Sequence, residues 1–120
     1  MRKLVLNTLF IVSILFSTHS ALGVTVFYTG NDLYSKLQDW KSSSPSNAIT
    51  AGAGAGYVVG IADAVNGKTA AGGKFCLPQN VNVQQLIDVA YNYLNANPQE
   101  RHLTASSIVV YAFSQAFPCK

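Results

Sequence analysis

Cys76, Cys119 and His102 are the residues whose types come closest to a reactive site in this chain. A cysteine beside a histidine is the nucleophile and base of many hydrolases, and a carboxylate such as Asp63 or Asp88 would orient the imidazole. An even number of cysteines instead indicates a disulfide when a chain is exported, as the first 23 residues of this one predict. With two cysteines only one pairing exists, and a bonded cysteine has no thiolate to offer. The favoured prediction is therefore a Cys76–Cys119 disulfide, which would stabilise the domain by on the order of 4 kcal/mol.

Other kinds of catalytic or ligand site lack their motifs. After residue 23 the sequence has a single histidine and two cysteines, too few for a zinc site once the cysteines are paired. Gly52, Gly54 and Gly56 fit neither phosphate-binding spacing, because Tyr57 stands where the third glycine of a dinucleotide fingerprint would be. No paired carboxylates at helical spacing suggest acid–base work. We expect no enzyme, no metal ion and no cofactor.

The first 23 residues have the pattern of a secretory signal peptide. A basic start, Met1-Arg2-Lys3, precedes an apolar run over residues 4–16 and a small, polar stretch up to Gly23. We expect cleavage near Gly23, with Ser20 as the other candidate, and a domain over residues 24–120. The apolar run is shorter than the ~20 residues that span a bilayer, so we expect no stable membrane insertion after cleavage.

Charge excludes one class of partner. The whole chain carries +3, but Arg2 and Lys3 leave with the signal, so six basic residues remain against five acidic ones, a net charge of +1. A nucleic-acid-binding domain carries a cluster of basic residues on one face. No such cluster remains here, and we expect no nucleic-acid partner.

The rest of the chain predicts an all-α domain, a small bundle of about four helices. The third helix has the clearest start, with Asn82 as N-cap and Gln85 as its capping-box partner, and Pro98 ends it. We place the first N-cap at Asn31. Residues 24–30 are a short strand or an extended lead-in. The predicted helices cover residues 31–41, 48–65, 82–98 and 104–117.

The second helix is rich in glycine, which is costly in a helix. Each interior glycine loses up to about 1 kcal/mol relative to alanine. Gly52, Gly56 and Gly60 recur at every fourth residue, so they share one face on which another helix could approach closely. We therefore predict a packing surface, inside the domain or across a dimer. Asp63 argues against a membrane span.

Three segments together resemble a known family in their order and spacing. They read "GYVVGIADAVNG" over residues 56–67, "FCLPQNVNVQQLIDVAYNYLNANP" over 75–98 and "RHLTASSIVVYAFSQAFPC" over 101–119. They resemble the Rap/Tai immunity proteins of type VI secretion. The family often has threonine at the position of Asn82, and the glycine run before Tyr57 and the "TAAGGK" loop are peculiar to this chain.

The resemblance implies a periplasmic all-α protein, often a homodimer, that binds a peptidoglycan-cleaving amidase and neutralises it without catalysis. Such an inhibitor would cover the catalytic cleft with protruding loops or a helix end. The candidate loops are residues 67–74 and 97–102. Their candidate contact residues are polar side chains on turns, with ordinary solvated surface as the alternative: Lys68, Lys74, Gln99, Arg101 and His102.

Two other functions remain open from the sequence. A small periplasmic chaperone activated by acid also combines one disulfide with a helical dimer, but it relies on many carboxylates, and this chain has five. A structural envelope domain without a toxin partner would give no protection phenotype.

Overall fold

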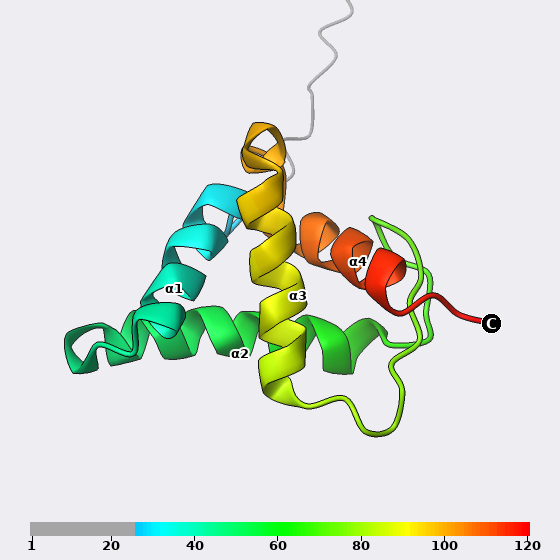
Figure 1. The fold of residues 1–120 in the computed structure, drawn as a ribbon. Coiled ribbons are helices and arrows are strands. Elements are labelled where there is room, and N and C mark those ends of the chain that lie inside the picture. The colour runs from blue at the N-terminus through cyan, green and yellow to red at the C-terminus, as the bar shows by residue number, and fades with distance from the viewer. Residues whose placement is uncertain (1–25) are drawn as a thin grey trace, which may run out of the picture.

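The computed structural model describes residues 26–120, which form an all-α bundle (Figure 1). The predicted signal peptide, residues 1–23, lies outside the described residues, as do Val24 and Thr25. The predicted fold class is confirmed, and the second helix has the predicted bounds. The elements in chain order are α1 (Gly30–Ser42), η1 (Pro45–Asn47), α2 (Ala48–Val65), α3 (Val83–Ala96), η2 (Pro98–Glu100) and α4 (Ala105–Ala116), where η marks a 3-10 turn.

Capping boxes begin two of the helices. At α3, the Asn82 side chain accepts a hydrogen bond from the Gln85 amide and the Gln85 side chain accepts one from the Asn82 amide, both 2.9 Å long, as predicted. At α1 the predicted cap, Asn31, is wrong. Thr29 caps this helix together with Asp32, because a threonine followed three residues later by a carboxylate satisfies two free amides reciprocally.

The core lies where the four helices meet. Figure 1 shows α3 crossing α2, with α1 and α4 on either side of α3. Phe75, from the loop between α2 and α3, is fully buried, and its ring packs edge-on against Phe113 with centroids 5.1 Å apart. Within residues 26–120 no polar side chain is buried. The largest fully buried side chains are Phe75, Phe113, Leu33, Leu37, Ile87, Leu94, Val58 and Val109.

The start of α1 is attached to the connection between α3 and α4. The Gly30 amide donates to the Leu103 carbonyl over 2.9 Å, and the Asn31 amide donates to the Arg101 carbonyl over 2.7 Å. A Cβ atom at Gly30 would lie 2.6 Å from Cδ1 of Ile108, so only glycine fits there without rearrangement. The described part of residues 24–30 forms one isolated bridge, between Thr29 and Thr104, rather than a strand.

The predicted disulfide joins Cys76 to Cys119, and it links the C-terminus to the loop between α2 and α3. The Cys76 amide also donates to the Phe117 carbonyl over 2.9 Å. Residues 67–74 turn back along α4 before Phe75 enters the core. This turn needs backbone angles that glycine adopts freely, with φ of 107° at Gly72 and 129° at Gly73.

The glycine face of α2 differs from the prediction. A Cβ atom at Gly52, Gly56 or Gly60 would meet nothing within 4 Å, so these three glycines pack against nothing inside the domain. The close approach is at Gly54, where a Cβ atom would lie 2.7 Å from the Cβ of Lys36 in α1. The helix turns about 100° per residue, so the glycine that faces α1 is on a different side from the predicted stripe. Packing inside the domain is therefore wrong for Gly52, Gly56 and Gly60.

By length and composition α2 is also long and apolar enough to cross a membrane. Core helices of globular domains share this length and composition. Val58 and Ala62 of α2 are buried against the other helices, and Asp63 is exposed.

Candidate partner-binding surface

Both predicted contact loops flank α4. Residues 97–102 lead into its first turn, while residues 67–74 lie along its side. A Cβ atom at Gly72 would lie 2.3 Å from the Ser107 carbonyl oxygen and 3.0 Å from the Tyr111 amide nitrogen. In Figure 1 the two loops lie at separate places around α4 and do not form one continuous rim. The structure thus places both predicted loops next to α4, and their contact with a partner stays a prediction.

A pocket lies between α4 and the loop that precedes it, and we call it the tyrosine pocket. Its volume is about 290 Å³. Leu103 is 47% exposed and Tyr111 is 44% exposed, whereas Ile108 is 4% exposed. Leu103 and Tyr111 are therefore available to a partner, and tyrosine is among the residue types that most often anchor protein interfaces. The pocket is lined by Tyr93, Glu100, Leu103, Ser107, Ile108 and Tyr111.

Two contacts fix the geometry of this pocket. The Tyr93 hydroxyl donates a hydrogen bond to Oε2 of Glu100 over 2.6 Å, which ties the last turns of α3 to η2. The Tyr93 ring meets the Tyr111 ring edge-on, with centroids 5.6 Å apart. Burial, followed by the hydrogen bond to Glu100, raises the pKa of Tyr93 to about 12. Tyr93 therefore remains a neutral donor at any physiological pH. The sequence does not predict this pocket, because Tyr93 and Tyr111 lie on two different helices, α3 and α4.

Arg101 holds the fold together rather than standing free. Its Nε donates to the Leu94 carbonyl over 2.7 Å, and a terminal guanidinium nitrogen donates to the Asn95 carbonyl over 3.3 Å. The guanidinium also lies 3.6 Å from the centre of the Tyr34 ring. These contacts satisfy carbonyls at the end of α3, which would otherwise lack a partner. Arg101 thus links the end of α3 to α1.

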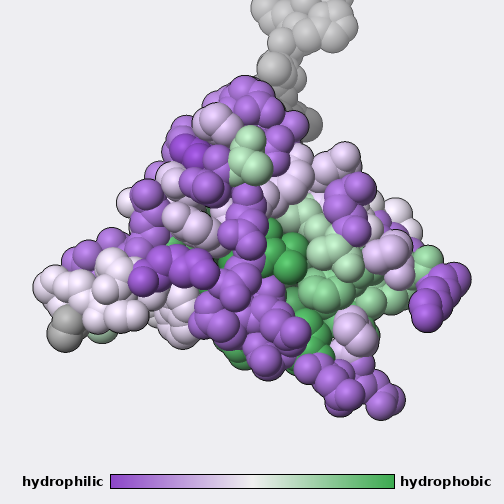
Figure 2. Space-filling view, viewed as in Figure 1, coloured by the Kyte–Doolittle hydropathy of each residue, from purple (hydrophilic) through white to green (hydrophobic). Residues whose placement is uncertain are grey.

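The other predicted contact residues are exposed: Lys68, Lys74, Gln99 and His102. Lys68 donates through Nζ to the Ala64 carbonyl over 3.1 Å at the end of α2. Figure 2 shows hydrophilic side chains over the near side of α3, while hydrophobic side chains gather over α4 and the adjoining loop. An apolar surface bordered by polar loops is the usual composition of a protein-binding surface.

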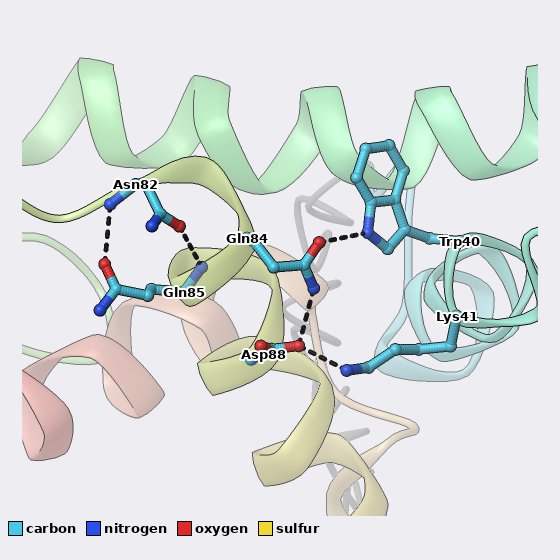
Figure 3. A network of polar contacts seen from close by, with 6 residues as sticks. All are labelled: Trp40, Lys41, Asn82, Gln84, Gln85 and Asp88. Atoms are coloured by element: carbon cyan, nitrogen blue, oxygen red, sulfur yellow. Dashed lines mark hydrogen bonds and ion pairs between the residues drawn. The ribbon is translucent and has the colours of Figure 1, made fainter.

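Apart from the tyrosine pocket, a polar cluster connects α1 to α3 (Figure 3). Trp40 donates through Nε1 to Oε1 of Gln84 over 3.1 Å, and Gln84 donates to Asp88 over 2.9 Å. Lys41 forms an ion pair with Asp88, and this hydrogen bond lowers the pKa of the Asp88 carboxyl. The polar side chains of this cluster bond to one another across the contact between α1 and α3. We therefore assign it to the fold.

The hypothesis of a cysteine nucleophile has no support in the geometry. Cys76 is bonded to Cys119 and has no free thiol to pair with His102. Within residues 26–120 no three histidine, cysteine or carboxylate side chains come together as metal ligands.

Comparison with known proteins decides the family. A family model described as Rap1a immunity proteins matches residues 29–119. This chain belongs to the Rap1a immunity family. The matched range runs from the Thr29 cap of α1 to the second disulfide cysteine, so it includes all four described helices. The resemblance found in the sequence is thus confirmed. Immunity proteins of this family bind a cognate effector and are generally not enzymes. The comparison with curated proteins finds no match.

Proposed function

We propose that this chain is a periplasmic immunity protein that binds a peptidoglycan amidase effector of type VI secretion and covers its active-site cleft. Membership of the Rap1a immunity family is the observation that carries the proposal. The signal-like residues 1–23 support export, and the Cys76–Cys119 disulfide suits an oxidising compartment. The amidase and the secretion system come from the sequence resemblance.

The fold supports inhibition by covering a cleft rather than by chemistry. Capped helices and a disulfide hold residues 67–74 and 97–102 on a rigid scaffold, so little conformational entropy is lost when they bind. A stable protein interface buries roughly 800 Å² on each partner, more than one loop offers. The tyrosine pocket and the two loops, which lie at separate places around α4, together offer a larger area.

A homodimer is part of this proposal, with α2 as the contact. The open face of α2 includes Gly56 and Gly60, which together with Ile61 and Val110 line an apolar groove of about 430 Å³. Glycines allow two helices to approach closely, and a second copy would bury surface that the domain leaves open. Ile49 is 89% exposed at the start of α2, and a dimer contact along the whole helix would bury its side chain.

Protection in cells tests the function. A strain that lacks this chain is challenged with sibling cells that deliver the effector, and we expect lysis, which a plasmid copy of the chain prevents. A sibling strain that delivers a catalytically inactive effector is the control and should kill neither strain. Normal survival of the deletion strain, despite delivery shown in a sensitive strain, would contradict the immunity role.

Two biochemical measurements test the inhibition of the amidase and the periplasmic location separately. Purified residues 24–120 should bind the amidase and abolish its cleavage of peptidoglycan at a stoichiometric ratio. Osmotic-shock fractionation should release the chain with periplasmic markers, without residues 1–23. If the chain protects cells but leaves amidase activity unchanged in vitro, the immunity role holds and occlusion of the cleft does not.

A further inference from the structure

Within residues 26–120, Glu100 is an acidic side chain without a cation, set at the edge of an apolar pocket. Its Oε2 accepts a hydrogen bond from Tyr93 over 2.6 Å, and within the described chain Oε1 accepts none. Within residues 26–120 the single ion pair joins Lys41 to Asp88, on the side of α3 that meets α1. Glu100 therefore contributes an uncompensated negative charge to the tyrosine pocket.

The neighbouring cation does not neutralise this carboxylate. Arg101 directly follows Glu100, but its guanidinium lies 3.6 Å from the Tyr34 ring centre and donates to carbonyls at the end of α3. Glu100 and Arg101 carry opposite charges and are adjacent in the sequence, but in the fold their side chains contact different residues. The carboxylate thus stays available to a group from outside the domain.

The remaining walls of the pocket suit a long side chain with a charged end. Leu103 and Ile108 are aliphatic, and they would contact a methylene stem. Tyr93 and Tyr111 also line the pocket, and the face of a tyrosine ring attracts cations. An aliphatic wall, two tyrosine rings and a carboxylate together complement a lysine or arginine side chain in both shape and charge.

We propose that the tyrosine pocket receives a basic side chain, lysine or arginine, from the effector, with its charged end bound to Glu100. This inference rests on the proposed function, because the effector is the partner that supplies the side chain. Tyr93 is a positioning residue: its hydrogen bond holds the carboxylate at the pocket before the partner arrives. Tyr111 and Leu103 cover the stem and exclude water from the ion pair.

Binding measurements on matched variants test the pocket. The probe is a catalytically inactive variant of the amidase against which this chain protects cells, titrated calorimetrically with purified residues 24–120. Glu100→Gln keeps an acceptor for the Tyr93 hydroxyl and removes the charge. We expect it to weaken binding roughly ten- to a hundredfold, since a charge-assisted hydrogen bond is lost. It should also reduce the dependence of affinity on salt concentration.

Asp63→Asn is the matched control, because it removes one exposed acidic charge from α2, outside the pocket lining. Its affinity should stay within about twofold of the unaltered chain. A comparable loss in both variants would mean that only overall charge matters, and it would overturn the assignment. Circular dichroism of both variants checks that they are folded.

A charge exchange identifies the partner group. Glu100→Arg should abolish binding, and one lysine- or arginine-to-glutamate variant of the effector should restore it. If no such variant restores binding, or if Glu100→Gln binds as tightly as the unaltered chain, the inference is wrong while the immunity function stands. If the unaltered chain binds no amidase, the proposed function fails and this inference fails with it.

Discussion

Gly54 of α2 lies so close to Lys36 of α1 that a Cβ atom at Gly54 would stand 2.7 Å from the Cβ of Lys36 and 3.2 Å from its carbonyl carbon. Because backbone lies opposite, the space cannot open by rotation of a side chain alone. This approach brings α1 and α2 together, and it distinguishes Gly54 from the other three glycines of the helix.

Alanine substitutions should therefore have opposite effects at two neighbouring glycines. Gly54→Ala should lower the free energy of unfolding by about 1–3 kcal/mol, because it overfills a close contact. Gly56→Ala, at an open position of the same helix, should raise it by up to about 1 kcal/mol through helix propensity. Urea denaturation of both variants measures the difference. Equal effects of the same sign would contradict the close contact at Gly54.

The proposed dimer makes a separate prediction at Gly56. Gly56→Leu should leave the domain folded, since nothing lies within 4 Å of a Cβ atom there, but it should obstruct the approach of a second copy. We expect a change from dimer to monomer by size-exclusion chromatography with light scattering. A monomeric unaltered chain, or a dimer that survives this substitution, would exclude α2 as the contact.

Opening the disulfide should destabilise the domain by on the order of 4 kcal/mol, because the bond closes a long loop of the unfolded chain. Cys76 and Cys119 are separated by 43 residues. The double variant Cys76→Ser/Cys119→Ser and chemical reduction should give the same loss in thermal melts. A melting temperature that is unchanged after reduction would show that the two thiols are not bonded in solution.

Arg101 should matter for stability more than for partner contact. Arg101→Ala removes two hydrogen bonds to carbonyls of α3 and the contact with the Tyr34 ring, so we expect a loss of about 1–3 kcal/mol. His102→Ala, at the exposed neighbouring position, should change stability by less than about 0.5 kcal/mol. If Arg101→Ala is fully stable but no longer binds the effector, Arg101 is a contact residue instead.

The raised pKa of Tyr93 makes the stability fall at alkaline pH. The pKa of Tyr93 is about 12 in the folded state against an ordinary value of 10.0, so the folded state holds this proton more tightly than the unfolded state. The associated stability is fully present below pH 10 and is lost as the pH rises toward 12. Tyr93→Phe should show a shallower loss in urea denaturation across that range. An equally steep loss in both proteins would mean that another group causes it.

Much of the local structure follows from the sequence because short-range rules determine it. The Asn82–Gln85 cap and the end of α3 before Pro98 depend on residues within four positions of one another. The disulfide needed only the count of cysteines. The same local rule applies at α1. The Thr29–Asp32 pair is not predicted there, because residues 24–30 are assigned to a strand or an extended lead-in.

Long-range relations required the tertiary structure. Spacing alone grouped Gly52, Gly56 and Gly60 on one face of a helix, but which face meets α1 depends on how the two helices are rotated about their axes. The same applies to Glu100 and Arg101, which are neighbours in sequence. Tyr93 of α3 donates a hydrogen bond to Glu100, whereas the ring of Tyr34 in α1 contacts Arg101. Packing between separate helices therefore decides which of the two charges remains free for a partner.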